Sequence, residues 1–534
     1  MKVLLCQAFA AVFCWSVTAI DNSIEESTLL AAPGLIGSGT FQQLIDHSDP
    51  KSGKFSERYF YDATKWKGPG SPVIFSTTGE EPIWTVVNNL SNKKELAAYL
   101  QKGAVKILAE KLGAAIVLLE HRYFGQSVPV SNLSDANMRF NTPQNSVADN
   151  VYFARNAVLA FDPNGSSVAT KAPWVFIGGS LPGAIAAWTE KVSPGTFWSY
   201  WASSATSQGM SSSTYTLPII EHGMPRNCSN DVAKVVAEID RIGTSGTELE
   251  KQELKKSFGL SLLTHYDDFA AAVFRAIPDF QSGRDLSEFF AFCDIIEGVH
   301  GIPAQSNVAK NRPADTKPAR PQLPGPEGVG LAKALAAYAS ISRFTWEGSP
   351  LIITLQTYNS RNPIYTGQQL NQRGPSPSSD TRAYRWWQCI WPSGFDPVAP
   401  ANRNGSIISR FVSDEYMVHQ CKMHFPEKMA QSHASWDELN AFTGGWSDRN
   451  STRLLYISGD HDPWFHMTPL SPLRPGGALK STEDRPALVI PGGHHAVDLQ
   501  PECDRMPACV EVRAKAIEKT VHWVKEFRPP TVLG

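Results

Sequence analysis

Short runs of apolar residues alternate with helical stretches in the first part of the chain and again near its end. The runs are continuously apolar, which is typical of strands in a parallel sheet that is covered on both faces. The strands we predict lie at residues 72–77, 114–120, 174–177, 200–205, 453–457 and 487–490. Apolar residues at helical spacing predict helices at 96–112, 150–161 and 184–192. Strands and helices in alternation indicate an α/β protein.

The α/β pattern stops near residue 207 and returns near residue 446. The intervening sequence is helical and irregular, with helices predicted at 232–242, 248–258 and 331–342 and a Pro-rich loop at 303–326. We therefore predict one α/β sheet domain built from residues 20–206 and 446–534. A mostly helical cap insertion would occupy residues 207–445.

Composition and charge narrow the class of protein. The 534 residues are 42% hydrophobic, which excludes global disorder. The 49 Lys and Arg residues nearly balance the 51 Asp and Glu residues, for a net charge of −2. A nucleic-acid partner is therefore not expected, because such proteins carry a strongly basic surface.

The N-terminus has the pattern of a secretory signal peptide. Lys2 precedes an apolar run at 3–17 that ends in small residues, so we expect a signal at 1–19; a buried helix is the alternative. No other stretch reaches the roughly 18 apolar residues that span a bilayer, so no membrane partner is expected. The mature chain would be secreted, or would enter a vacuolar or lysosomal lumen.

Cysteines and glycosylation sequons agree with export. Of eight cysteines, Cys6 and Cys14 fall within the expected signal, and the remaining six suggest disulfides in an oxidising compartment. Six cysteines allow 15 pairings, although Cys503 and Cys509 are close enough to bridge locally. Asn-x-Ser/Thr sequons begin at residues 89, 132, 164, 227, 404 and 450.

Ser180 is the strongest candidate for chemistry. It follows a predicted strand through Gly178 and Gly179 and precedes a helix rich in small residues. Glycines permit a sharp strand-to-helix turn, which presents the serine hydroxyl at the positive end of the helix. The usual G-x-S-x-G pattern is altered here, since Pro182 takes the position of the last glycine. Taken alone, the motif also fits an ordinary tight turn or an anion-binding helix start.

A nucleophilic serine needs a base and an orienting carboxylate, and both follow late strands. Asp460 and Asp462 come after the strand at 453–457, and His494 and His495 after the strand at 487–490. The chain order Ser, Asp, His is that of α/β-hydrolases. In isolation, an aspartate before proline also forms turns, and a strand-end histidine can be simply polar. No ligand spacing indicates a metal, and no cofactor is expected.

These residues resemble a known family, the serine peptidases of lysosomal Pro-X carboxypeptidase and dipeptidyl peptidase II, and especially its secreted fungal acid prolyl endopeptidases. The similarity runs from about residue 41 to the C-terminus. It rests on the segments at 120–125, 174–180, 194–198, 326–331, 462–464 and 491–493. The resemblance implies an α/β-hydrolase sheet with a helical cap and activity in acid.

The resemblance also implies site residues. The nucleophile falls on Ser180 and the acid on Asp462, and a His-x-x-Asp-Leu pattern selects His495 over His494 as the base. The indole of Trp464 would help to shape a proline-accepting pocket; core packing is its alternative role.

The oxyanion would be received by the backbone N–H of Leu181 and by the turn around Gly79. Leu181 and Pro182 depart from the family pattern, as does Trp391 where relatives have Glu.

The sequence thus predicts a secreted serine peptidase that cleaves after proline in peptides or unfolded proteins, as an endopeptidase or as a dipeptidyl- or carboxypeptidase. An esterase or lipase with the same triad, or a catalytically silent binding protein, remains an alternative.

Overall fold

The computed structural model describes residues 34–82, 102–210, 212–277, 288–299, 324–347, 377–391, 397–400, 405–431, 436–448 and 450–529. The expected signal peptide and most of the Pro-rich loop lie outside the described residues. The chain forms two compact units. A sheet unit comprises Val17–Ser211, Leu370–Phe395 and Phe425–Gly534, and a helical unit includes Ser212–Gln369 and Asp396–His424.

The sheet unit is built on an eight-stranded sheet with the order β1-β2-β4-β3-β5-β6-β7-β8. Its strands are β1 (Ile36–Leu44), β2 (Lys54–Asp62), β3 (Val73–Thr77), β4 (Ala115–Leu119), β5 (Trp174–Gly179), β6 (Ser199–Ser203), β7 (Leu454–Gly459) and β8 (Ala487–Ile490). All strands from β4 to β8 in this order pair in parallel. The architecture confirms the predicted α/β-hydrolase fold class.

Strands β1 and β2 were not predicted from the sequence. They form an antiparallel pair that joins the sheet through β2 and β4. The first half of β2 alternates exposed and buried side chains, and in this half the strand pairs with β1 but not with β4. Alternation of this kind is the pattern of a half-buried antiparallel strand, in contrast to the continuously apolar parallel strands.

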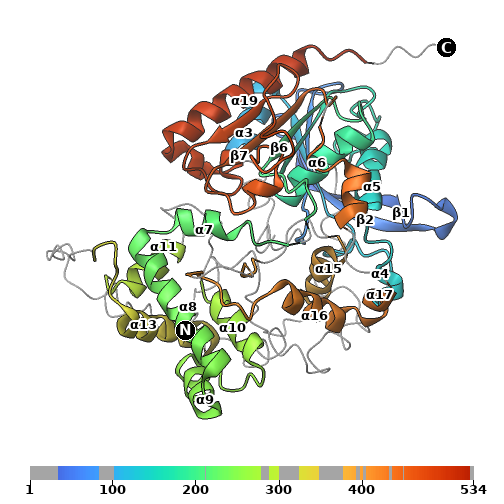
Figure 1. Cartoon of the computed structure of the whole chain (residues 1–534). Coiled ribbons are helices and arrows are strands. Elements are labelled where there is room, and N and C mark those ends of the chain that lie inside the picture. The colour runs from blue at the N-terminus through green and yellow to red at the C-terminus, as the bar shows by residue number, and fades with distance from the viewer. Residues whose placement is uncertain are drawn as a thin grey trace. The chain divides into compact units, whose positions relative to one another are not determined.

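Helices cover both faces of the sheet. Helices α3 (Gly103–Leu112) and α19 (Pro507–Lys525) pack on one face, where apolar residues such as Ile74 and Val175 meet them. Phe75 and Phe176, one residue further along the same strands, point to the opposite face. Figure 1 shows α3 and α19 together on one side of β6 and β7, with α5 (Pro143–Asn156) and α6 (Leu181–Val192) on the other.

The prediction of a helix at 150–161 was wrong about both its first and its last residue. Helix α5 begins at Pro143, behind the capping side chain of Thr142, and ends at Asn156. A proline is well tolerated in a first helical turn, so the helix starts earlier than its apolar pattern suggested. It ends earlier because Ala157 is extended and the backbone N–H of Ala160 is donated to the Tyr59 hydroxyl of β2.

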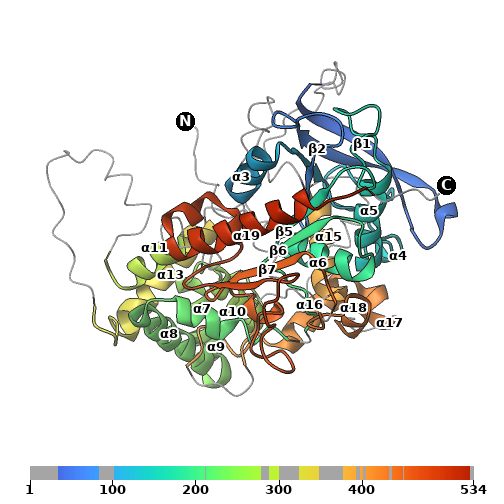
Figure 2. The same ribbon diagram turned by 90° about the horizontal axis from the view of Figure 1, so that it is seen from above.

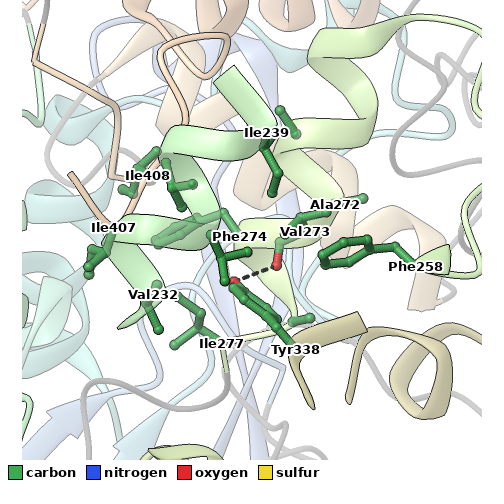
Figure 3. Packing of buried hydrophobic residues seen from close by; sticks show 14 of the residues in the cluster. Val232, Ile239, Phe258, Ala272, Val273, Phe274, Ile277, Tyr338, Ile407 and Ile408 are labelled. Carbon is green, nitrogen blue, oxygen red and sulfur yellow. Dashed lines mark hydrogen bonds between the residues drawn. The ribbon is translucent and has the colours of Figure 1, made fainter. Parts of the chain in front are cut away.

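The helical unit has its own core. Its described helices are α7 (Leu217–Gly223), α8 (Arg226–Ser245), α9 (Glu248–Ser257), α10 (Tyr266–Arg275), α11 (Glu288–Ile296), α13 (Leu331–Glu347) and α16 (Asp414–His424). Helices α11 and α13 pack against α8 (Figure 2). In the core, the Tyr338 hydroxyl donates to the carbonyl of Val273 at 3.0 Å (Figure 3). The ring of this tyrosine is therefore buried without leaving its polar atom unpaired.

Disulfides brace both units. Cys228 and Cys293 join α8 to α11 across 65 residues, and Cys503 bonds Cys509 as predicted. No described cysteine has a free thiol. None of the described helices is long and apolar enough to cross a bilayer.

Helix α15 (Pro377–Ile390) belongs to the sheet unit, although we expected the insertion to run without interruption from 207 to 445. The side chains of α15 bond to other residues of the sheet unit, which explains why this helix belongs to that unit. Arg382 forms a buried ion pair with Asp135 at 2.7 Å. Trp386 donates its indole N–H to the carbonyl of Asn141, and Asp380 accepts the backbone N–H of Gly125. The helices α4 (Asp135–Met138), α17 (Pro426–Gln431) and α18 (Trp436–Thr443) complete the described part of this unit.

The burial of Asp380 predicts that the stability of the folded chain depends on pH. One of its carboxyl oxygens is buried without a hydrogen-bond partner, and burial raises the pKa of Asp380 to about 7. A carboxyl whose pKa is raised on folding favours the folded state below its unfolded pKa, and that advantage is lost as pH rises toward the folded value. We expect Asp380→Asn, which keeps an acceptor for Gly125, to raise the melting temperature near pH 8 by a few degrees and to leave it nearly unchanged near pH 4. Thermal unfolding of both proteins at the two pH values tests this; an equal shift at both would contradict it.

Candidate active site

The turn that carries Ser180 is tight and strained. Ser180 has φ 63° and ψ −131°, a conformation that is costly for a residue with a side chain. A Cβ on Gly178 would lie 2.3 Å from the backbone of Pro182, and one on Gly183 would lie 2.6 Å from the carbonyl oxygen of Ser203. The glycines are therefore required by close backbone approach. Pro182 fits because it lies in the first turn of α6.

The hydroxyl of Ser180 is left available for chemistry. Ser180 precedes the first residue of α6, yet its side chain makes no capping hydrogen bond. Its backbone N–H is donated to the carbonyl of Ser203 in β6 at 3.0 Å, which fixes the turn to the neighbouring strand. The serine is partly exposed, as a nucleophile that receives substrate must be.

Asp462 and His495 form a hydrogen-bonded pair. His495 Nδ1 lies 2.9 Å from Asp462 Oδ1, and the Asp462 side chain is completely buried. The same carboxylate accepts the backbone N–H of Trp464 at 2.9 Å and the Ser458 hydroxyl at 3.0 Å. A buried carboxylate with several donors is held in one orientation, and it fixes the imidazole that it contacts.

The pair shifts the pKa of both members. Burial alone would raise the pKa of Asp462, but the His495 charge and the donated hydrogen bonds lower it below its ordinary value. Burial alone would lower the pKa of His495, but the Asp462 carboxylate raises it above its ordinary value. Each shift favours the charged form, so the site stabilises an imidazolium beside a carboxylate.

The other aspartate and the other histidine at these strand ends, Asp460 and His494, do not take part in this hydrogen-bonded pair. Asp460 is exposed and accepts the backbone N–H of Gly492 at 2.6 Å. His494 has a buried Nδ1 without a partner, and burial lowers the pKa of this histidine. Of the two aspartates and two histidines that the sequence offers, the structure brings Asp462 and His495 together.

The serine turn and the histidine loop lie side by side. A Cβ on Gly179 would lie 3.0 Å from the Cβ of Ala496 and 3.2 Å from Cδ1 of Leu499. In the part of the chain that the structure describes, no hydrogen bond joins the Ser180 hydroxyl to His495. Hydrogen bonds between a nucleophile and its base are often long before substrate binds. The close contact between the Ser180 turn and the histidine loop is therefore the observation that bears on whether the two residues act together.

The turn after β3 abuts the first turn of α6. Gly79 has φ 67°, and a Cβ there would lie 2.6 Å from Cδ of Pro182. Leu181, the other residue expected to receive the oxyanion, has a buried side chain at the start of α6. The two predicted donors are thus on adjacent turns, and their role stays a prediction.

The sequence predicted that the backbone turn at residues 78–80 lies at this site, but it predicted no role for the carboxyl of Glu80. Burial raises the pKa of Glu80, and this carboxyl interacts electrostatically with His495. Its position directly after the predicted oxyanion residue Gly79 was the available signal.

Trp464 contributes to the site through its backbone. The residue is 8% exposed, and its N–H is donated to Asp462. Its indole as part of a substrate pocket stays a prediction. No group of His, Cys, Asp or Glu residues suited to a metal occurs among the residues that the structure describes.

Comparison with known proteins identifies the family. The family described as "Serine carboxypeptidase S28" matches residues 43–276. The chain is 32% identical to "Serine protease vicPa" of Bipolaris victoriae (strain FI3), over 92% of this chain and 90% of the relative.

More distant relatives cover similar lengths of the chain. A "Probable extracellular serine carboxypeptidase" of Arthroderma benhamiae (strain ATCC MYA-4681 / CBS 112371) is 25% identical, over 86% of this chain and 63% of the relative. The "Thymus-specific serine protease" of Homo sapiens is 23% identical, over 96% of this chain and 92% of the relative. The fold, the paired Asp462 and His495 beside a strained serine, and these matches lead to one conclusion: the chain belongs to the S28 family and is a serine peptidase.

Proposed function

We propose that this peptidase is secreted and hydrolyses peptide bonds on the C-terminal side of proline, with Ser180, His495 and Asp462 as its catalytic triad. The observation that carries the triad is the 2.9 Å contact between His495 Nδ1 and Asp462 Oδ1 at the edge of the sheet where the Ser180 turn lies. With Nδ1 bonded to the carboxylate, Nε2 is the ring nitrogen left to take a proton.

The reaction would proceed through an acyl-enzyme. Ser180 Oγ attacks the carbonyl carbon of the proline residue while His495 takes the hydroxyl proton, and the same proton then goes to the leaving amine of the next residue. Water attacks the ester in the second half of the cycle, with His495 again as base. Backbone N–H groups at Leu181 and in the Gly79 turn would stabilise the oxyanion, and one such donor contributes about 2.7–4 kcal/mol.

Proline preference is supported by the nature of the residue and by Trp464. Proline has no backbone N–H to satisfy, so an apolar aromatic surface can accept its ring without leaving a buried donor unpaired. Trp464 follows Asp462 by two residues, and its backbone is fixed to that carboxylate. An indole in this position would contact the side chain of the residue that precedes the scissile bond.

Secretion is supported by the leader-like N-terminal sequence and by the disulfides. Disulfides such as Cys228–Cys293 persist in oxidising compartments. A relative from Arthroderma benhamiae carries the description "extracellular".

Ser180→Ala should abolish hydrolysis of a Z-Gly-Pro-type amide without changing the melting temperature, because the hydroxyl is the nucleophile. A fluorophosphonate probe should label the unmodified protein at Ser180 and leave the variant unlabelled. Turnover by the variant at the unmodified rate would refute the assignment.

Asp462→Asn should lower kcat by about 10⁴-fold, since an amide cannot hold the imidazole in the required tautomer. Asp460→Asn is the matched control: it lies two residues away, retains an acceptor for Gly492 and should keep kcat within about twofold of the parent. Steady-state kinetics of both variants decide the question, and equal losses would contradict the distinction between the two aspartates.

Mass spectrometry of cleavage products from a proline-rich peptide library tests the specificity. We expect cuts after proline, and we expect Trp464→Ala to lower kcat/KM for proline substrates more than for alanine substrates. Cuts distributed without regard to proline would overturn the specificity while leaving the peptidase assignment intact.

A further inference from the structure

We propose that Ser203 and Ser204, at the carboxyl end of β6, are positioning residues that hold the serine turn and the histidine loop in register, Ser203 through Asp498 and Ser204 through the backbone of Ala496. This inference rests on the proposed triad. None of these side chains needs to touch substrate, because each acts through hydrogen bonds to the loop that carries His495.

The order of strands makes such a device necessary. The predicted nucleophile follows β5, the acid follows β7 and the histidine follows β8, and β6 lies between β5 and β7. Strands are about 4.8 Å apart, so the loop after β8 must cross roughly three strand spacings to reach the turn after β5. A loop that spans this distance needs fixed points on the strands that it crosses.

Ser204 provides one fixed point for the histidine loop. Its hydroxyl oxygen accepts the backbone N–H of Ala496 at 2.8 Å, directly beside His495. The hydroxyl thereby joins the histidine loop to the end of β6.

The backbone of Ser204 is shaped for this task. Its φ is 46°, an uncommon value for a residue other than glycine, and its N–H is donated to the carbonyl of Ile457 in β7 at 2.7 Å. Ala496, its hydrogen-bond partner, also has a positive φ of 49°. Strain on both sides of one hydrogen bond indicates that the contact between β6 and the histidine loop is enforced by the surrounding structure.

Ser203 and Asp498 provide the second fixed point. The Ser203 hydroxyl donates to Asp498 Oδ1 at 2.5 Å, and the Trp201 indole donates to Asp498 Oδ2 at 2.8 Å. Asp498 is 1% exposed, so its carboxyl is committed to these β6 side chains. The carbonyl of Ser203 at the same time accepts the N–H of Ser180. One residue of β6 thus holds the serine turn through its backbone and the histidine loop through its side chain.

Serine substitutions with a matched control test the proposal. Ser204→Ala and Ser204→Gly both remove the hydroxyl, and glycine also relieves the positive φ. Ser203→Ala removes the bond to Asp498 but keeps the carbonyl that binds Ser180. Ser199→Ala is the control, because Ser199 lies on the same strand, is fully buried and has a hydroxyl without a partner.

The measurements are kcat and KM on a Z-Gly-Pro amide, with the concentration of active sites set by fluorophosphonate titration. We expect both Ser204 variants to lower kcat per titrated site about tenfold to hundredfold, the effect of leaving the buried N–H of Ala496 without its acceptor, with KM changed less than about twofold. Ser203→Ala should lower kcat in the same way, and Ser199→Ala should not. Asp498→Asn weakens the contact between Ser203 and Asp498 without changing β6, so it should lower kcat in the same way.

The possible outcomes separate this inference from the proposed triad. If Ser180→Ala is inactive while the Ser204 and Ser203 variants match Ser199→Ala in kcat, the positioning role is overturned and the triad stands. If the losses disappear once active sites are titrated, the serines only support folding, and the inference again fails. If Ser180→Ala keeps full activity, the proposed triad fails first.

Discussion

The hydrogen bond between Asp462 and His495 is the interaction around which the site is organised. A carboxylate buried without partners is costly enough to be excluded from protein interiors. Here Asp462 is fully buried, and it is satisfied by His495, by the backbone of Trp464 and by Ser458. The loop after β7 therefore has to turn back on its own carboxylate, and the loop after β8 has to bring an imidazole to it. The conformations of both loops thus provide hydrogen-bond donors to one buried charge, the Asp462 carboxylate.

Three of the five described non-glycine residues with a positive φ lie at the turns and loops that build the site. Ser180, Ser204 and Ala496 have positive φ values of 63°, 46° and 49° although none is glycine. They lie after β5, after β6 and in the loop after β8, which are the points where the chain leaves the sheet to build the site. Strain of this kind persists only where the surrounding structure over-determines it. The sheet supplies that rigidity, because its strands are covered by helices on both faces.

Much of this arrangement could be predicted because parallel strands end at the same edge of a sheet. Ser180, Asp462 and His495 each follow a continuously apolar run, and continuous runs of that kind are readable without a structure. The choice between His494 and His495 came from a resemblance, whereas the structure distinguishes them by which one reaches Asp462.

What escaped prediction depends on contacts between distant parts of the chain. Strands β1 and β2 are defined by their pairing, and helix α5 ends where a backbone N–H reaches Tyr59. Ser204 and Glu80 look like ordinary polar residues at strand ends until the histidine loop is placed beside them. Sequence spacing locates the reactive groups, but the hydrogen bonds that orient them are set only by the folded sheet.

The titration of His495, followed by NMR of the isotope-labelled histidine ring, examines the central interaction most directly. We predict that the pKa of His495 in the parent protein lies above the ordinary histidine value of about 6.5, because Asp462 favours the imidazolium. In Asp462→Asn the pKa should fall, because the carboxylate that most strongly opposes the effect of burial has been removed. The same pKa in both proteins would contradict the claim that this carboxylate governs the imidazole.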